Sequence, residues 1–385
     1  MNDYNKQRNL FSERGFPVNK RTAFLMGGYG GAGKRIARLL LKETNLDLII
    51  AGRHKDLALS FSADLNGKFG DRTNGAYVDA SNPASLSSAF RDVDVVIAAS
   101  TTTQYVEGTA RAAITAGIDY LDIHHPQNIF PVLMRMAMEI EDAGLCFITQ
   151  AGFYPGLPSV LTRWASRYFT SYRKAIMGVA MNTQFEKGSS LDEFIDSLGD
   201  YGAEVYKGGR WRQGGLRDVV KIDFGSTIGV KTCYPMTMEE MRSMPRALGL
   251  EEAGVYVASL NWFVDYLVTP TAMVLRRVQM GLGRDFLASL MVWGLEKFSS
   301  PDDEVVLVLE AEGVDEVGPL KVRVVAEYND AYYITAVPVA ACLLQYLDGS
   351  IDQPGLWIMG QVVDPYRFVN DMRRMVIRFE ITARK

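Results

Sequence analysis

The stretch that decides the fold is Met26–Lys34, MGGYGGAGK, because it fits two phosphate-binding loops that imply different chemistry. Gly28, Gly30 and Gly33 have the spacing of G-x-G-x-x-G, the dinucleotide-binding pattern. Gly28, Gly33 and Lys34 also have the spacing of G-x-x-x-x-G-K-[ST], the loop of nucleoside triphosphatases. The first pattern predicts a protein that uses a nicotinamide or flavin, and the second predicts a phosphoryl-transfer enzyme.

The residue after the lysine favours the dinucleotide. The triphosphatase loop needs Ser or Thr there because that hydroxyl binds the magnesium ion, whereas this chain has Arg35, a cation that would repel the metal. The apolar run 21–26 predicts a buried strand before the loop, and Ile36, Leu39 and Leu40 predict an amphipathic helix after it. The glycines therefore lie on a strand-to-helix turn, as the dinucleotide pattern requires.

Each glycine of the pattern has an expected role. We expect Gly28 to make the tight turn, Gly30 to let the backbone approach a pyrophosphate, and Gly33 to let the helix pack closely on the strand. The pyrophosphate would meet the N–H groups at the start of the helix, where the helix dipole also favours an anion. The predicted cofactor-binding loop comprises Gly28, Tyr29, Gly30, Gly31, Ala32 and Gly33.

The end of the second strand indicates which nicotinamide is bound. The run Asp47–Ala51 is apolar after its first residue, and strands at this place often end in an acid that holds the adenosine ribose. Here Gly52 and Arg53 follow instead, and the first acid is Asp56. Because arginine binds phosphate through paired hydrogen bonds, Arg53 predicts NADP in preference to NAD, although a solvated basic turn would have the same sequence.

The alternation of strands and helices continues to about residue 150. Further strands are expected at 75–78, 92–99, 120–122 and 145–148. Such an alternation predicts an α/β fold with a doubly wound parallel sheet that binds its ligand at the carboxyl ends of the strands. We therefore expect Asp79 and Ala80 to border the adenine, and Ser100 and Thr101 to lie along the cofactor toward its nicotinamide.

The later part of the chain predicts a second, α+β domain. A turn rich in Pro and Gly at 152–158 marks a hinge, and we expect a hairpin within 203–218. Extended runs at 303–311 and 320–328 predict antiparallel strands. Polar residues interrupt the apolar stretch 253–275, so we interpret it as a buried helix of this domain or of a subunit interface, not as a membrane span.

Composition narrows the function further. The chain has 385 residues, 48% of them hydrophobic, and a formal net charge of −4. It has no Lys/Arg tract suited to nucleic acid, and its polar N-terminal residues lack the apolar core of a signal peptide. Three cysteines at unrelated spacings predict neither a metal site nor a disulfide framework. We expect two domains in a reducing, cytoplasmic setting.

Several motifs together resemble the saccharopine dehydrogenase family of NAD(P)-binding oxidoreductases over nearly the whole chain. They are the GGYGGAG loop, the AGR strand end, VDASN, YVEGTARAAITAGIDYLDI, AGFYPGLPSVL and GLWIMGQVVDPYRF. The resemblance implies a Rossmann domain that carries NADP(H), an inserted α+β domain on a mainly antiparallel sheet, and dimerisation through that domain. We accordingly expect the cofactor domain at 1–150, the substrate and dimerisation domain at 151–345, and a segment at 346–385 that returns to the Rossmann domain.

The resemblance leaves the substrate open among imines, amino acids, and lipid-linked enoyl or keto groups. Relatives that use saccharopine-like substrates tend to carry an acid before the Pro-Gly of the hinge turn, and Tyr154 at this place disfavours an aminodicarboxylate. Arg210, Arg212 and Arg246 are candidates for binding a substrate carboxylate, although solvation at the surface is the simpler interpretation. Aromatic residues around Trp262 favour an apolar substrate slightly, and they would serve equally well as a dimer core.

Candidate catalytic residues follow the strand at 120–122. His124 and His125 should lie at the carboxyl edge of the sheet, and histidine titrates near neutrality, which suits proton delivery. A packing role for His124 fits the sequence equally well. Tyr154 is the third candidate, because its hydroxyl could donate in the same region.

The predicted function is hydride transfer between NADP(H) and a small-molecule C=N, C=O or C=C substrate. A non-catalytic NADP-binding sensor or assembly subunit would keep the glycine loop without needing a proton donor. A phosphoryl-transfer enzyme is the least favoured alternative. We expect a homodimer that binds neither nucleic acid nor metal. We also expect that the chain has no membrane-spanning segment.

Overall fold

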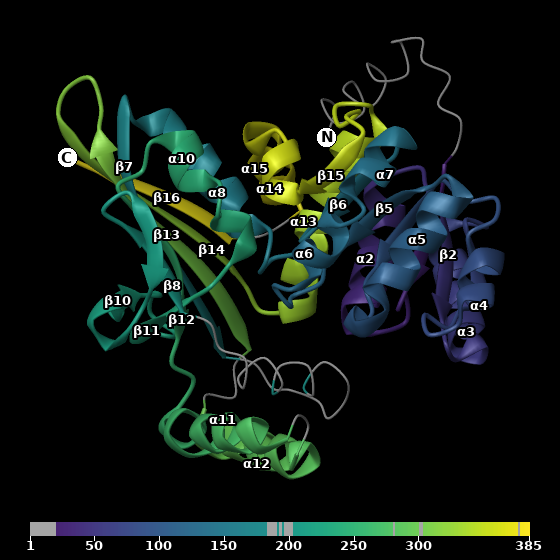
Figure 1. The fold of residues 1–385 in the computed structure, drawn as a ribbon, viewed down its shortest axis with the longest axis horizontal. Coiled ribbons are helices and arrows are strands. Elements are labelled where there is room, and N and C mark those ends of the chain that lie inside the picture. Colours follow the sequence, from purple (N-terminus) through teal and green to yellow (C-terminus); the bar gives the residue numbers. More distant parts are fainter. Residues whose placement is uncertain are drawn as a thin grey trace.

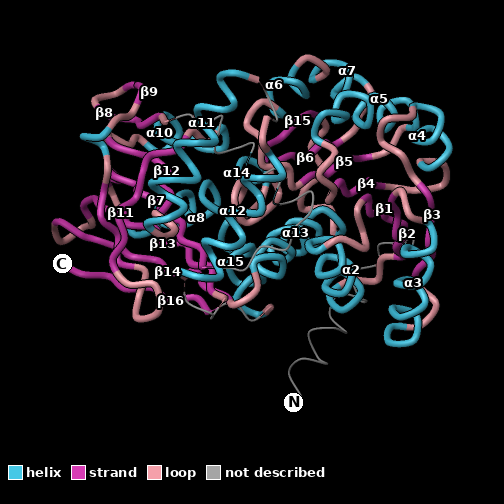
Figure 2. The backbone as a smooth tube through the Cα atoms, turned by 90° about the horizontal axis from the view of Figure 1, so that it is seen from below, coloured by secondary structure: helices cyan, strands magenta, loops and turns pink. Residues whose placement is uncertain are grey.

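The computed structural model describes residues 21–182, 191, 195, 203–279, 282–299, 303–375 and 378–385. In this part of the chain, two β-sheets lie at opposite ends of the molecule and helices fill the space between them (Figure 1). Seen from below, the strands form two separate groups, and helices α13, α14 and α15 lie between these groups (Figure 2).

The first sheet has seven strands within the described residues, all parallel, in the order β3-β2-β1-β4-β5-β6-β15. Its strands are β1 (Thr22–Met26), β2 (Asp47–Gly52), β3 (Thr73–Tyr77), β4 (Val95–Ala98), β5 (Asp119–Asp122), β6 (Cys146–Thr149) and β15 (Gly355–Ile358). Its helices are α2 (Gly31–Glu43), α3 (Lys55–Phe69), α4 (Pro83–Ala89), α5 (Val106–Ala116), α6 (Ile129–Met134) and α7 (Ala137–Asp142). The order of β1 to β6 is that of dinucleotide-binding folds, so the predicted doubly wound sheet is confirmed.

Local sequence explains why these elements begin and end where they do. Every residue of β4 and β6 is buried, as expected for parallel strands with helices on both faces. The Asn82 side chain accepts hydrogen bonds from the N–H groups of Ala84 and Ser85 and so caps α4. Gly117, in the left-handed conformation at φ 68°, ends α5.

The second sheet runs in the order β10-β11-β12-β7-β13-β14-β16, and β8 pairs with both β12 and β9. Its strands are β7 (Ser171–Asn182), β8 (Glu204–Lys207), β9 (Arg210–Gln213), β10 (Val220–Asp223), β11 (Val230–Met236), β12 (Glu252–Ala258), β13 (Glu304–Val314), β14 (Pro319–Tyr328) and β16 (Arg378–Arg384). Only β12 and β7 are parallel among the described pairs. The predicted pairing of 303–311 with 320–328 is confirmed in β13 and β14. The hairpin predicted within 203–218 is confirmed in β8 and β9.

A helical excursion lies below the second sheet in the view of Figure 1. It comprises the π-helical turn η5 (Val264–Val268), α11 (Thr269–Val278) and α12 (Arg284–Phe298). The expectation of one buried helix over 253–275 is wrong. The residues up to Ala258 belong to β12, and the helical part exposes Trp262 (55%) and Tyr266 (72%). The apolar stretch therefore contains two elements, and the second of them has only a small core of its own, built around Val264.

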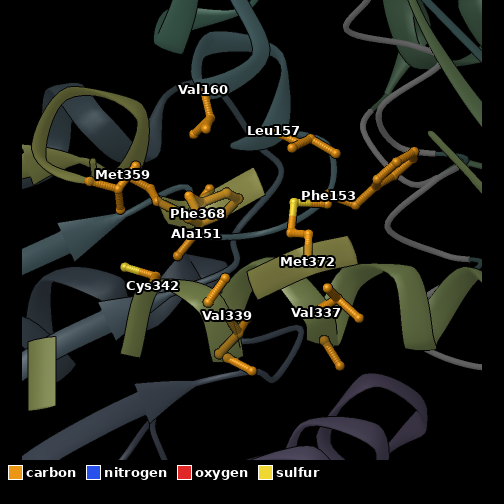
Figure 3. Close-up of a cluster of buried hydrophobic side chains, with 14 of the residues drawn as sticks. Ala151, Phe153, Leu157, Val160, Val337, Val339, Cys342, Met359, Phe368 and Met372 are labelled. Carbon is orange, nitrogen blue, oxygen red and sulfur yellow. The ribbon is translucent and has the colours of Figure 1, made fainter. Parts of the chain in front are cut away.

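Helices between the sheets share one hydrophobic core with both. They are α8 (Leu157–Ala165), α10 (Met244–Leu248), α13 (Ala331–Leu347), α14 (Met359–Val362) and α15 (Pro365–Arg374). Figure 3 shows Phe368 and Met372 of α15 between Val337 and Val339 of α13 and Leu157 of α8. The chain after α13 contributes to both sheets, because β15 pairs with β6 and β16 pairs with β14. Among the described helices, none is both long enough and apolar enough to cross a membrane.

Candidate cofactor site

The carboxyl ends of the parallel strands bring most of the predicted site residues to one edge of the first sheet. The residues that follow these strands are Gly27 to Gly30 after β1, Gly52 and Arg53 at β2, Asp79 and Ala80 beyond β3, Ser100 and Thr101 beyond β4, His124 and His125 beyond β5, and Gln150 after β6. Open α/β sheets bind their ligands at this edge, beside the point where the strand order reverses. Here that point lies between β1 and β4.

The tight turn after β1 is made by Gly27, not by Gly28 as the sequence suggested. Gly27 has φ +76°, and its N–H donates to the carbonyl of Ala51 at 2.8 Å. A Cβ at Gly27 would lie 2.8 Å from the carbonyl oxygen of Ala99 and 2.9 Å from Cα of Ser100. Position 27 therefore requires glycine for both its conformation and its space. The sequence has two adjacent glycines here, Gly27 and Gly28. The G-x-G-x-x-G spacing includes Gly28 and so gave the turn to the wrong one.

Gly33 packs helix α2 against the loop as expected. A Cβ at Gly33 would lie 2.1 Å from the carbonyl oxygen of Gly27. Gly30 is the N-cap of α2 and provides no side chain to cap the helix, and the first turn carries no acid. The N–H groups that begin α2, at Gly31 and Ala32, are therefore placed to bind an anion.

Tyr29 folds onto the end of β2. Its hydroxyl accepts a hydrogen bond from the backbone N–H of His54 at 2.9 Å. A Cβ at Gly52 would lie 2.5 Å from the Tyr29 hydroxyl oxygen and 2.7 Å from two ring carbons. Tyr29 thus fills the space into which a side chain at position 52 would extend. Sequence spacing alone gave no sign of this contact, because the two residues are on different strand ends.

Arg53 and Asp79 lie near each other across the ends of β2 and β3. Arg53 is exposed. Hydrogen bonds from Ser81 and, to a smaller extent, the charge of Arg53 lower the pKa of the Asp79 carboxyl. Ala80 is 8% exposed and packs in the hydrophobic cluster on that face of the sheet. The charge of Arg53 is therefore felt by Asp79 at the end of the sheet where adenine is expected.

Ser100 lies directly against the turn at Gly27, so the structure brings the β4 end into contact with the glycine loop. The hydroxyl oxygens of Ser100 and Thr102 are 2.7 Å apart and share a hydrogen bond. Thr101 is half-buried beside them. This short polar segment follows β4, on the side of the reversal point away from β2.

Asp122 joins the ends of β5 and β6. Its side chain is fully buried, and Oδ1 accepts hydrogen bonds from the N–H groups of His124 and Gln150, both at 3.1 Å, and from the Thr149 hydroxyl at 2.9 Å. Burial and then the Asp122 carboxylate raise the pKa of the Tyr120 hydroxyl. Asp122 therefore holds the ends of β5 and β6 together through these hydrogen bonds.

His125 and Tyr154 form a pair at this edge, with ring centroids 5.4 Å apart. Burial lowers the pKa of His125 to about 4, so its neutral form predominates at pH 7, contrary to the expected titration near neutrality. Burial also lowers the pKa of His124, which the Asp122 carboxylate partly offsets. The His124 side chain is 5% exposed, whereas Tyr154 is half-buried and its hydroxyl donates to Sδ of Met236 in the second domain.

A chain of amides links this edge to the second domain, and sequence reasoning did not find it. The Gln127 side chain accepts hydrogen bonds from the N–H of Glu239 at 2.7 Å and from Nε2 of Gln150 at 3.3 Å. Gln150 is fully buried and has φ +56°, an uncommon conformation for a residue other than glycine. Such conformations are often found at functional sites, and Gln150 follows β6 at the same edge of the sheet as the other candidates.

The remaining predicted candidates lie elsewhere. Arg212 pairs with Asp218 through Nη1 at 3.0 Å, and Arg210 and Arg246 are exposed on β9 and α10. The aromatic residues around Trp262 belong to the helical excursion, so they do not line the sheet edge. Among the described residues, no group of three or more His, Cys, Asp or Glu side chains is placed to hold a metal ion.

The loop and the strand ends described above are similar to a known domain family. Residues 24–148 match the family described as the saccharopine dehydrogenase NADP binding domain. No curated protein matches the sequence. The match covers the glycine loop and the ends of β2 to β5.

One solved structure extends the likeness in fold to 95% of the chain. The apo histidine-tagged saccharopine dehydrogenase (L-Glu forming) from Saccharomyces cerevisiae is similar with a TM-score of 0.64 and 14% identity, covering 95% of this chain and 100% of that chain. This likeness shows the fold. An engineered D-amino acid dehydrogenase bound to NADP+ has a TM-score of 0.47 and 13% identity, covering 91% of this chain and 96% of that chain. A dehydrogenase (MviM) from Clostridium difficile has a TM-score of 0.42 and 7% identity, covering 92% of this chain and 97% of that chain.

Proposed function

We propose that this chain, whose residues 24–148 match the saccharopine dehydrogenase NADP binding domain family, is an NADP-dependent oxidoreductase. It would transfer hydride between NADP(H) and a small-molecule C=N, C=O or C=C substrate. The observation that carries the proposal is the glycine loop at the start of α2. Its N–H groups, together with the carboxyl ends of the neighbouring parallel strands, suit a dinucleotide. Residues 1–150 would hold the cofactor, 151–345 would hold the substrate, and 346–385 would join the two.

The preference for NADP rests on the end of β2. Tyr29 fills the space of a side chain at Gly52, where an acid would hold the ribose of NAD. Arg53 follows immediately and is exposed, so its guanidinium can reach a 2′-phosphate. Asp79 and Ala80 would border the adenine, and Ser100 and Thr101 would lie beside the nicotinamide half.

Fluorescence titration tests this preference. NADPH should bind more tightly than NADH, and Arg53→Ala should weaken NADPH binding about tenfold or more while it leaves NADH binding nearly unchanged, because a charge-assisted hydrogen bond is lost. Lys55→Ala is the matched control, since Lys55 is an exposed cation two residues away. Equal affinity of the unaltered protein for the two nucleotides would contradict the assignment of Arg53.

For the chemical step, we propose that His125, in the loop after β5, and Tyr154, in the loop after β6, face the substrate, and that His124 orients the loop after β5. Because the pKa of His125 lies near 4, its neutral ring would serve as a hydrogen-bond partner and the Tyr154 hydroxyl would be the donor. NADPH oxidation with a panel of imines, ketones and enoyl compounds tests this. Tyr154→Phe should reduce kcat about 100-fold without weakening NADPH binding. Binding of NADPH without turnover of any substrate would favour a non-catalytic sensor instead.

We also propose that the chain forms a homodimer through its helical excursion. The exposed apolar residues of this excursion include Tyr266 (72%), Val278 (72%), Phe286 (63%) and Trp293 (49%). A dimer interface of apolar and aromatic residues would remove this surface from water. Light scattering after gel filtration tests the proposal, because Phe286→Glu should convert a dimer into a monomer. A protein that is already monomeric would rule out this interface. A cytoplasmic setting fits the three buried free cysteines.

A further inference from the structure

We infer that Tyr332, which lies about 300 residues after the glycine loop, is a positioning residue of the dinucleotide site. Gly31 is the first residue of α2 and is not part of the G-x-G-x-x-G pattern. A Cβ at Gly31 would lie 2.6 Å from Cζ of Tyr332 and 2.7 and 2.8 Å from the two Cε atoms. The hydroxyl end of the Tyr332 ring therefore packs directly on the first residue of the helix, and a side chain at position 31 would have to displace this ring.

An ion pair holds Tyr332 in this place. Asp330 caps α13, since its Oδ1 accepts hydrogen bonds from the N–H groups of Tyr332 and Tyr333, both at 2.9 Å. Oδ2 of the same carboxylate accepts from Nε of Arg35 at 3.1 Å and lies 3.0 Å from its Nη2. The Arg35 guanidinium also lies 5.6 Å from the centre of the Tyr332 ring. The ion pair of Arg35 with Asp330, which we call the clasp, thus joins the start of α2 to the start of α13.

This clasp borders the place where the proposed function needs a pyrophosphate. The first turn of α2 has no acid and no side-chain cap, and Lys34 and Arg35 add positive charge beside it. The Tyr332 side chain is 37% exposed, so one part of the ring rests on Gly31 while the rest remains accessible. A phenolic hydroxyl at this position can donate to a phosphate oxygen. Tyr332 would then fix the loop before the cofactor arrives and contact the pyrophosphate when it is bound.

The contact part of the inference rests on the proposed function and is tested by NADPH titration of the full chain. Tyr332→Phe removes only the hydroxyl, and it should weaken NADPH binding about tenfold without changing the unfolding temperature. Tyr333→Phe is the control, because the Tyr333 hydroxyl donates to the carbonyl of Met375 instead of facing the loop. Unchanged NADPH affinity in Tyr332→Phe would overturn the contact with the cofactor.

The packing part is tested by combining Gly31→Ala with Tyr332→Ala. Gly31→Ala should weaken NADPH binding and lower the unfolding temperature in the unaltered chain, because the new methyl group collides with the ring. In the Tyr332→Ala variant, Gly31→Ala should lower the unfolding temperature and the NADPH affinity by less than a third as much, since the space is then open. Equal effects in the two backgrounds would overturn the packing role. If the unaltered chain binds no nucleotide, the proposed function fails, while the unfolding temperatures still decide the packing.

Discussion

At the scale of single residues, the end of β2 is where we expect the choice between NADP and NAD to be made. The absence of an acid at position 52 is a weak argument by itself, because many turns lack one. The contact with Tyr29 strengthens it, since a side chain at Gly52 would begin 2.5 Å from the Tyr29 hydroxyl oxygen. Tyr29 and Gly52 therefore have to change together if the cofactor is to change.

We accordingly predict that the coenzyme preference changes only in a double variant. Gly52→Asp alone should weaken the binding of both NADPH and NADH, because the new carboxylate collides with Tyr29. Gly52→Asp combined with Tyr29→Ala should restore NADH binding and shift the ratio of dissociation constants about tenfold toward NADH, since the acid can then reach the ribose. A single Gly52→Asp variant that prefers NADH would show that Tyr29 does not control the position.

Glu240 is a residue with a pH-dependent effect on stability. It lies in η4 (Glu239–Met241) and is fully buried, and its two carboxylate oxygens accept hydrogen bonds from the N–H groups of Gly156 at 2.8 Å and Ser159 at 2.9 Å, at the start of α8. Burial raises the pKa of this carboxyl to about 7. A folded-state pKa above the unfolded value means that the folded chain holds the proton more tightly.

The contribution of Glu240 to the free energy of unfolding should therefore fall as pH rises. It is fully present below about pH 4.5, where both states are protonated, and it is lost as the pH rises through about 7. The loss should be on the order of 3 kcal/mol. Urea unfolding of the unaltered chain and of Glu240→Gln between pH 5 and 8 measures it, and the variant should lack this slope. The same slope in both proteins would assign it to other groups.

At the scale of elements, two helical glycines differ in whether the packing of their helix requires them. Gly33→Ala in α2 should destabilise the chain by about 2–3 kcal/mol, because its Cβ would lie 2.1 Å from the Gly27 carbonyl oxygen. Gly67→Ala in α3 is the matched change, since nothing lies within 4 Å of its Cβ, and it should stabilise by up to about 1 kcal/mol. Thermal unfolding of the two variants decides the matter. Two changes of the same sign would refute the packing argument.

The elements of the first sheet could be predicted because their signals are local. An apolar run, a cap at Asn82 and a stop at Gly117 each act within a few residues. The packing of Tyr332 on Gly31 and the contact of Tyr29 with Gly52 could not be predicted, because each joins residues that only the folded chain brings together. The prediction of one buried helix over 253–275 was wrong for two reasons. Hydrophobicity alone does not distinguish a strand such as β12 from a helix, and it does not distinguish buried from exposed apolar residues.

At the scale of the whole molecule, the two sheets share their core. One cluster of buried side chains includes Leu25 of β1, Leu307 of β13 and Val337 of α13, whereas the helical excursion has a separate cluster around Val264. A shared core couples the stability of the two sheets, and a separate small core allows a part to open by itself.

Hydrogen exchange should show this division. The slowest amides of β1 and β13 should exchange with the same opening free energy and the same dependence on denaturant, because both require global unfolding. The amides of α11 and α12 should exchange through a smaller opening. Mass spectrometry of peptides from these elements measures both, and a lower opening free energy for β13 than for β1 would show that the sheets unfold independently.

The crossing of the chain after α13 has a consequence for synthesis on the ribosome. The edge strand β15 of the first sheet and the edge strand β16 of the second both come from residues 355–384. As the chain leaves the ribosome from its N-terminus, each sheet must wait with an open edge until these residues emerge. An unpaired edge can recruit strands from other chains. Nascent copies that stall before residue 355 should therefore depend on chaperones more than the complete protein does.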